Sequence, residues 1–250
     1  MRVVGSSPAV QRPGRACSCY LVRSRATAVA LDLGSGALGN LQVAIDYSQL
    51  DAAIVSHMHA DHFLDVIPLR YGLTYGARRR ADRLPLWLPP GGERILRTLC
   101  AAFPREGGDF LDDVFAVADY DPSSVLEIGD LRLTFRKTTH YIDAYAIRAD
   151  CVASSVTYSG DTAPCDAVVE HARGASLFLC EATLGLGTEE GARGHSSAVE
   201  AAEMARRADV RRLALTHYGP AEAPSALLAA ARTVFAGPVS VVDDGTEFSL

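Results

Sequence analysis

Long apolar runs are missing from this sequence, and its first residues lack the basic-then-apolar order of a secretion signal. A membrane-spanning or exported protein would need one of these features, so we expect a cytoplasmic protein with no membrane partner. Hydrophobic residues still make up 48% of the 250 positions and charged residues 22%. This balance is typical of a folded globular chain and excludes wholesale disorder.

Paired cysteines and an excess of basic charge are missing as well. The six cysteines stand apart without C-x-x-C spacing, which argues against a disulfide framework and against a structural zinc site. The net charge of −6 gives no general attraction to nucleic acid, although it leaves room for a local basic patch. We interpret the one basic run, Arg78-Arg79-Arg80, as a solvated helix end or loop rather than a nucleic-acid contact.

What the sequence does contain is a dense group of ligand-type side chains, Ser-His-Met-His-Ala-Asp-His at residues 56–62. An extended H-x-H segment places His57 and His59 on one side of the chain, and Asp61 and His62 then turn toward a second position. Burying so many polar groups without partners would be costly. Metal binding therefore explains the motif better than structural filling of a core.

The pattern on either side of this motif predicts one α/β domain spanning residues 1–250. Strands are predicted near the N-terminus and at residues 18–22, 28–31, 53–55, 86–88, 114–118, 126–128, 131–137, 144–149, 156–159, 177–180, 213–216 and 239–242. Helices are predicted at residues 63–69, 93–102, 166–172, 197–208 and 225–235. Ser197 and Glu200 match a capping box. Strands followed by helices in each half, with hairpins between, predict two sheets packed face to face under outer helices.

Three later strands of this prediction each end close to a residue that can bind metal. These residues are His140 after strand 131–137, Asp161 after strand 156–159 and His217 after strand 213–216. One such ending carries little weight, but three of them together with the first motif describe two adjacent metal sites at one edge of the sheets. The glycines among residues 32–36 would let the backbone approach that edge closely.

The order H-x-H-x-D-H at residues 57–62 resembles the signature of the metallo-β-lactamase-fold hydrolases. The resemblance implies an αββα four-layer sandwich of the α/β class, with two packed mixed sheets, outer helices and a dinuclear metal centre. Zinc suits imidazole and carboxylate ligands, and manganese and iron fit the same ligand types. In this arrangement one ion would be held by His57, His59 and His140, the other by Asp61, His62 and His217, with Asp161 bridging them.

Two such ions, roughly 3.5–4 Å apart, lower the pKa of a shared water and clamp an in-line displacement at phosphorus. Asp61 would additionally orient or deprotonate that water. The implied chemistry is hydrolysis of a phosphate ester.

Four further motifs place the resemblance within the ribonuclease Z-like branch. They are SGDT at residues 159–162, CEAT at 180–183, RGHSS at 193–197 and LTHY at 215–218. In that family the histidine matching His195 assists proton transfer to the leaving oxygen, and the alternative is a loop histidine that caps the following helix. Glu181 is equally compatible with orienting His195, with binding metal and with a structural hydrogen bond. His171 is expected on the surface of its helix, and the resemblance makes a homodimer the expected assembly.

The sequence departs from ribonuclease Z in one place. Many members insert an arm that grips transfer RNA between the segments matching His140 and Asp161, whereas here residues 141–160 hold only two short strands and a turn. With a pI near 5.6, this weakens the case for a large RNA substrate, because neutralising the backbone supplies much of such affinity. Compact relatives of this branch include small phosphodiesterases that act on cyclic nucleotides or related diesters.

We therefore favour a dinuclear metal-dependent phosphodiesterase whose substrate is a small phosphodiester such as a cyclic nucleotide. A tRNA 3′-processing endoribonuclease, its RNA gripped by the partner subunit of a dimer, is the alternative with the same chemistry. A basic stripe leading to the cleft would favour it. A third hypothesis is a non-catalytic metal-binding module that has kept the fold, and the full ligand set with His195 argues against it.

Overall fold

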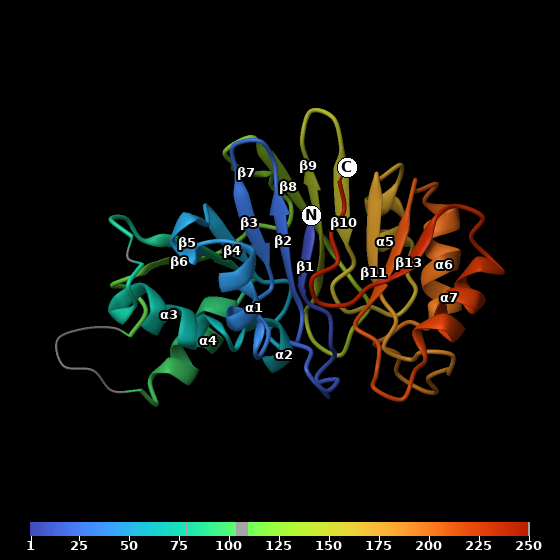
Figure 1. Cartoon of the computed structure of the whole chain (residues 1–250), viewed down its shortest axis with the longest axis horizontal. Helices are drawn as coiled ribbons and strands as arrows, with labels where there is room; N and C mark the ends of the chain where they lie inside the picture. The colour runs from blue at the N-terminus through green and yellow to red at the C-terminus, as the bar shows by residue number, and fades with distance from the viewer. Residues whose placement is uncertain (79, 104–109, 250) are drawn as a thin grey trace.

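A computed structural model describes residues 1–78, 80–103 and 110–249 of the chain. Two β-sheets occupy the centre of the molecule, and helices cover the outer side of each (Figure 1). Arg79 of the basic run lies outside the described residues, whereas Arg78 faces Asp46 and Arg80 donates to the backbone of Ser48. Within the described part of the chain, no helix is both long and apolar enough to cross a membrane.

The first sheet has six strands in chain order. They are β1 (Arg2–Gly5), β2 (Cys19–Arg23), β3 (Ala28–Leu31), β4 (Ala52–Ile54), β5 (Leu84–Leu88) and β6 (Phe115–Asp119). The pairs from β1 to β3 are antiparallel and those from β3 to β6 are parallel. Parallel neighbours need crossover connections, which here contain α1 (Ala37–Ala44), α2 (Ala60–Phe63), α3 (Val66–Tyr75) and α4 (Gly92–Cys100).

The second sheet has seven strands in the order β13-β12-β11-β10-β9-β8-β7. They are β7 (Leu126–Ile128), β8 (Leu131–Lys137), β9 (Tyr145–Asp150), β10 (Ser155–Tyr158), β11 (Leu177–Glu181), β12 (Leu213–Thr216) and β13 (Val239–Val241). Strands β7 to β10 are antiparallel, and β10 to β13 are parallel. The parallel crossovers contain α5 (Asp166–Ala172), α6 (Ala198–Arg207) and α7 (Pro224–Arg232). Two packed mixed sheets with outer helices confirm the predicted fold class.

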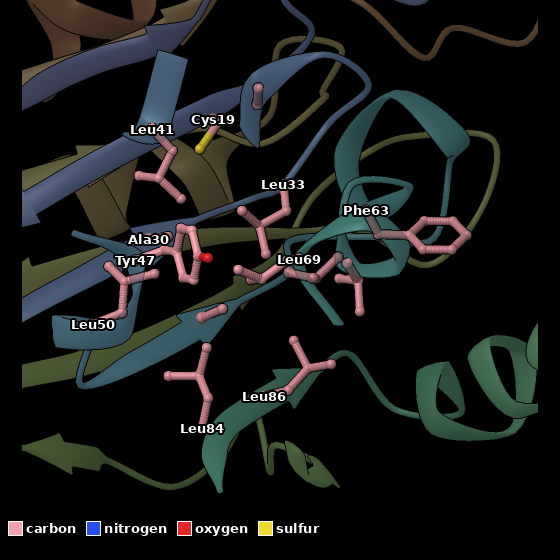
Figure 2. Close-up of a cluster of buried hydrophobic side chains, with 14 of the residues drawn as sticks. Cys19, Ala30, Leu33, Leu41, Tyr47, Leu50, Phe63, Leu69, Leu84 and Leu86 are labelled. Atoms are coloured by element: carbon pink, nitrogen blue, oxygen red, sulfur yellow. The ribbon is translucent and has the colours of Figure 1, made fainter. Parts of the chain in front are cut away.

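Three apolar layers hold this sandwich together, and strand periodicity sorts side chains between them. In β3, Val29 and Leu31 join the core shared by the two sheets, whereas Ala28 and Ala30 join the layer beneath the first helices. Figure 2 shows that outer layer, in which Leu69 of α3 lies with side chains of β5. A third layer packs α5, α6 and α7 on the second sheet.

Most observed elements agree with the predicted ranges to within a few residues, but the helix predicted at 63–69 is observed as two, α2 and α3. The backbone N–H of Leu33 donates to the carbonyl oxygen of His62 at 2.7 Å, and the N–H of Asp65 donates to the carbonyl oxygen of Leu33 at 2.9 Å. These bonds to the turn after β3 hold the chain between the two helices. The capping box of Ser197 and Glu200 is confirmed at the start of α6.

Helix α1 is not predicted by the sequence pattern. Its segment contains Gly39 and Asn40, both poor helix formers, and its start at Gly36 has no local side-chain cap. The cap comes instead from Asp65, whose carboxylate accepts the N–H groups of Gly36 at 3.1 Å and Leu38 at 2.7 Å. This helix therefore depends on a contact between segments far apart in the chain.

The prediction that His171 lies on the surface is wrong. The residue is only 8% exposed, because α5 packs across β8 and β9. Its Nε2–H donates to the carbonyl oxygen of Thr134 at 3.1 Å. Burial lowers the pKa of His171 to about 4.

Substituting His171 by glutamine is expected to reduce the loss of stability in acid. Because the folded-state pKa is about 4 and the ordinary value 6.5, the unfolded chain binds a proton more readily between these values, and stability falls as pH drops through that window. The expected loss at pH 5 is about 2 kcal/mol. Glutamine keeps an N–H donor and does not titrate.

Urea unfolding of metal-free protein at pH 7.5 and pH 5 measures this difference. Wild type should lose about 2 kcal/mol more than His171→Gln between the two values. Equal losses would mean that the folded protein protonates this ring as readily as the unfolded chain does.

Candidate active site

The histidine motif follows β4 at one end of the sheets as a loop whose last residues begin α2 (Figure 1). The turn after β3 lies directly against it. A Cβ atom placed on Gly34 would come within 2.0 Å of the carbonyl oxygen of Asp61. The close backbone approach expected for residues 32–36 is thus confirmed at Gly34.

Replacing Gly34 by alanine should displace this loop, because the added methyl group meets a backbone atom that cannot rotate away. We expect a loss of about 2 kcal/mol or more in the free energy of unfolding, together with weaker metal uptake. Gly39→Ala is the matched control, since Gly39 is a helical position with open space around its Cβ. That variant should gain about 0.5–1 kcal/mol. Equal effects of the two substitutions would contradict the role given to Gly34.

A first group of four predicted residues comes together from three segments: His57 and His59 after β4, His140 after β8 and Asp161 after β10. Their ligand atoms all lie within 4.8 Å of one another. Nδ1 of His59 lies 3.2 Å from Nε2 of His57 and 3.0 Å from Nε2 of His140. On its other side, His140 donates Nδ1–H to the carbonyl oxygen of Gly194 at 2.7 Å, which turns Nε2 toward the group.

A second group contains Asp61, His62 and His217 and again includes Asp161, with all ligand atoms within 4.8 Å. Oδ2 of Asp161 lies 3.4 Å from Nε2 of His62, and Oδ1 lies 3.6 Å from Nε2 of His217. Asp61 Oδ2 is 3.2 Å from the same nitrogen of His217. The structure therefore divides the residues as the sequence predicts, with Asp161 in both groups.

The residues of both groups fit divalent cations. Among the described residues, Nε2 of His62 and Oδ1 of Asp161 are buried ligand atoms without a hydrogen-bond partner, which is costly in a protein interior. Burial lowers the pKa of His57 and of His59, and a neutral ring is the form that binds metal. Burial alone would raise the pKa of Asp161, but His217 and His62 hold it well below its ordinary range. The carboxylate therefore keeps its charge.

Asp32 orients one side of this centre, although no sequence motif marks it. It is fully buried after β3, and its Oδ2 accepts hydrogen bonds from Nδ1 of His62 and from the hydroxyl of Tyr158, each at 2.8 Å. Its carboxylate also accepts the N–H and the hydroxyl of Ser56. Such bonds fix the tautomer of a metal-binding ring. The available signal was an acidic residue directly after a buried strand whose parallel neighbour leads to the histidines.

Glu181 connects several side chains on the side of the centre that is opposite Asp32. It is fully buried, and its Oε1 lies 2.9 Å from Nδ1 of His195 while accepting the N–H of Thr162 at 2.8 Å. Its Oε2 accepts the hydroxyl of Thr183 at 2.6 Å, and that hydroxyl accepts Nδ1–H of His217 at 2.8 Å. This geometry places Glu181 where it can orient His195, and its ligand atom also lies within 4.8 Å of those of His195 and His217. Thr183 was missed, although it stands in the CEAT motif.

His195 is half-buried beside the two groups, with Nδ1 held by Glu181. Burial works against a charged ring, but the hydrogen bond and the charge of Glu181 raise the pKa of His195 to about 9. Its second nitrogen, Nε2, is not used by Glu181 and is free to face a bound molecule.

One cavity of about 600 Å³ opens onto both groups. It is lined by Pro8, Ala9, Val10, His59, Ala60, Asp61, Tyr141, Asp161, Thr183, His195, His217, Gly219 and Pro220. Its size is in the range of small-molecule sites. Four of the predicted ligands, His59, Asp61, Asp161 and His217, line it together with His195 and several apolar residues.

Comparison with known proteins agrees with this geometry. Residues 32–218 match the beta-lactamase superfamily domain. The chain is 35% identical to an uncharacterized protein of Mycobacterium leprae, covering 99% of this chain and 87% of that one. It is 26% identical to the probable metallo-hydrolase YhfI of Bacillus subtilis, over 97% and 96% of the two chains. It is 28% identical to the ribonuclease Z of Methanothermobacter thermautotrophicus, over 96% and 93%.

Solved structures share the whole architecture. The crystal structure of Bacillus subtilis YhfI has a TM-score of 0.88 at 25% identity, covering 99% of this chain and 98% of that one. The short form of human tRNase Z and a diphosphatase of the PhnP family both have TM-scores of 0.75 at 19% identity, which shows a shared fold. They cover 99% and 100% of this chain, and 98% and 97% of their own chains respectively. The chain therefore belongs to the beta-lactamase superfamily and is a metallo-hydrolase with the compact, ribonuclease Z-like form of that fold.

Proposed function

We propose that this metallo-hydrolase is a dinuclear phosphodiesterase that hydrolyses a small phosphodiester such as a cyclic nucleotide. The observation that carries the proposal is the sharing of Asp161 by two ligand groups beside His195, with members of both groups and His195 lining one cavity. A single domain over residues 1–250 is part of the proposal. It is supported by the core shared between the sheets and by the bond from the Met1 amino group to the carbonyl oxygen of Phe248 at 2.8 Å.

The first group would hold one divalent cation and the second group the other, with Asp161 between them. Zinc is our first choice from the ligand types, and manganese or iron would use the same atoms. When bound, the ions would activate a water and neutralise charge on the phosphate. Asp61 lines the cavity and would orient that water, while His195 would donate a proton from Nε2 to the leaving oxygen. Glu181 would hold the His195 ring in place for this transfer.

A small substrate is supported by what surrounds the site. The described residues that line the cavity include no lysine or arginine, whereas proteins that hold nucleic-acid backbones neutralise several phosphates with basic side chains. Between His140 and Asp161 the chain forms only β9 and β10 with their connections, as expected. This leaves no space for an RNA-gripping arm in that segment.

A tRNA 3′-processing endoribonuclease is the second candidate, favoured by the 28% identity to a protein named ribonuclease Z. Offering the metal-loaded protein a 3′-extended precursor tRNA and a 3′,5′-cyclic nucleotide in one tube separates the two. We expect hydrolysis of the cyclic nucleotide. A clean cut at the 3′ junction of the tRNA, with the cyclic nucleotide intact, would reverse the ranking.

The expected homodimer rests on the family resemblance. Sedimentation of the purified protein across a concentration series tests it directly. A single species with the mass of one chain at all concentrations would refute it.

A further inference from the structure

Part of the cavity wall is apolar, in contrast to the charged and polar residues of the two metal groups. Pro8, Ala9, Val10 and Pro220 line it, together with Tyr141. Val10 is 70% exposed and Tyr141 51% exposed. Single exposed apolar side chains are ordinary on a protein surface, but these two border the cavity that holds the chemistry, where apolar walls bind the non-reacting part of a ligand.

Tyr141 is held in place on its other sides. Its hydroxyl donates a hydrogen bond to Glu189, whose second carboxylate oxygen accepts the N–H of Gly194 at 2.8 Å and that of His195 at 3.2 Å. The ring lies against Gly194 so closely that a Cβ there would come within 2.5 Å of it. The ring is therefore fixed before any ligand arrives, which reduces the entropy lost on binding.

The ring of Tyr141 lies close to the residues proposed to carry the reaction. Its centroid lies 5.6 Å from that of His195 and 5.0 Å from that of His140. A flat group resting on the exposed part of Tyr141 would thus be joined to a phosphate at the metal groups by a short linker such as a ribose. Bases stack on fixed aromatic rings in nucleic-acid-binding proteins through their faces, whatever their hydrogen-bonding edge.

The polar side chains nearby are already engaged. The hydroxyl of Tyr141 is bonded to Glu189, and that of Thr183 bridges Glu181 and His217. Of the described residues that line the cavity outside the two metal groups, only His195 has a side-chain nitrogen without a partner. This nitrogen, Nε2, is the one that the proposed reaction uses. Among the described residues of this wall, no unpaired polar side chain is placed to bond the edge of a base, and no lysine or arginine is placed to bind a second phosphate.

We propose that Tyr141, with the apolar segment from Pro8 to Val10, is a base-stacking wall that selects diesters carrying an aromatic base and a single phosphate. This inference rests on the proposed function and narrows its substrate class. If the wall binds bases only by stacking, adenine and guanine nucleotides should bind almost equally well. The base should then increase the affinity for the substrate and leave the rate of the chemical step unchanged.

Steady-state kinetics on three substrates test the wall: adenosine and guanosine 3′,5′-cyclic phosphates, and methyl riboside 3′,5′-cyclic phosphate, which lacks a base. Tyr141→Leu should lower kcat/KM for both nucleotides roughly 10–100-fold, mainly through KM, and change the base-free substrate less than about threefold. Tyr141→Phe should retain most of the activity. Tyr75→Leu, at a 66% exposed tyrosine of α3 outside the cavity lining, is the matched control and should change nothing.

A second readout does not need turnover. Calorimetric titration of adenosine 3′,5′-cyclic phosphate into EDTA-treated protein should show affinity for wild type and Tyr141→Phe that falls roughly 10–100-fold in Tyr141→Leu. Equal loss on the base-free and base-containing substrates would overturn the inference and leave the phosphodiesterase intact. Binding that depends on Tyr141 without hydrolysis of any diester by metal-loaded protein would instead overturn the proposed function.

Discussion

Asp161→Asn is expected to release both bound ions and to lower cyclic-nucleotide turnover on the order of 10³-fold or more. The carboxylate faces nitrogens of both ligand groups at 3.4 to 4.0 Å, and one of its oxygens is buried without a partner. An amide has the same shape but carries no charge, and its N–H₂ end would point a hydrogen-bond donor at the nitrogens proposed to bind a cation. Metal analysis of the purified variant and its turnover measure the two losses.

The matched control is Asp166→Asn. Asp166 begins α5, its side chain is 83% exposed, and it pairs with Arg207 on the surface. This variant should keep its metal content and its rate. Two ions and full turnover in Asp161→Asn would refute the shared-ligand mechanism.

His195→Ala is expected to lower kcat by roughly 10²- to 10⁴-fold on a cyclic nucleotide without loss of metal. The substitution removes the proposed proton donor, while the residues of the two metal groups stay. A donor matters only when the leaving oxygen is a poor leaving group. Diesters with a 4-nitrophenolate leaving group should therefore lose less than about tenfold in the same variant.

This contrast between substrates separates proton donation from a purely structural role, because a disturbed site would slow both diesters alike. His171→Gln is the control, since His171 is a buried histidine bonded to Thr134 rather than to the site. It should leave both rates unchanged. A loop histidine that merely precedes α6 would give a small and equal effect on both substrates.

Glu181 is linked by hydrogen bonds to both His195 and the second metal group. Its carboxylate bonds to His195 directly and reaches His217 through Thr183. The arrangement links the proposed proton donor and a residue of the second group to one fully buried side chain. A substitution there would disturb both, so its effects are less informative than those of His195→Ala.

The sequence identified the residues that form the two groups from the strand ends that precede them and from the resemblance of their motif to that of the metallo-β-lactamase-fold hydrolases. Strands β10 and β12 both run parallel to β11 in one sheet, so Asp161 and His217 emerge at the same end of that sheet, and the packing of the two sheets brings that end beside the histidine motif after β4. The strands themselves were predictable because a strand with one buried face, such as β8, has apolar residues at alternate positions. These features are local in the chain.

Features that depend on contacts between distant segments were decided by the tertiary structure. Asp65 caps α1 from beyond β4, and α5 buries His171 by packing across β8 and β9. The fixed direction of Tyr141 depends on Glu189, 48 positions away. No local pattern encodes which side chains such packing brings together.

In the active site too, some features follow from the sequence and others only from the tertiary structure. Residue type and spacing determined which atoms can bind cations, because imidazole and carboxylate chemistry belongs to the side chain itself. Which ring nitrogen faces the centre was decided by Asp32 and Gly194, through hydrogen bonds to the opposite nitrogens of His62 and His140. Those partners come from other strands and loops, so only the folded chain brings them within bonding distance.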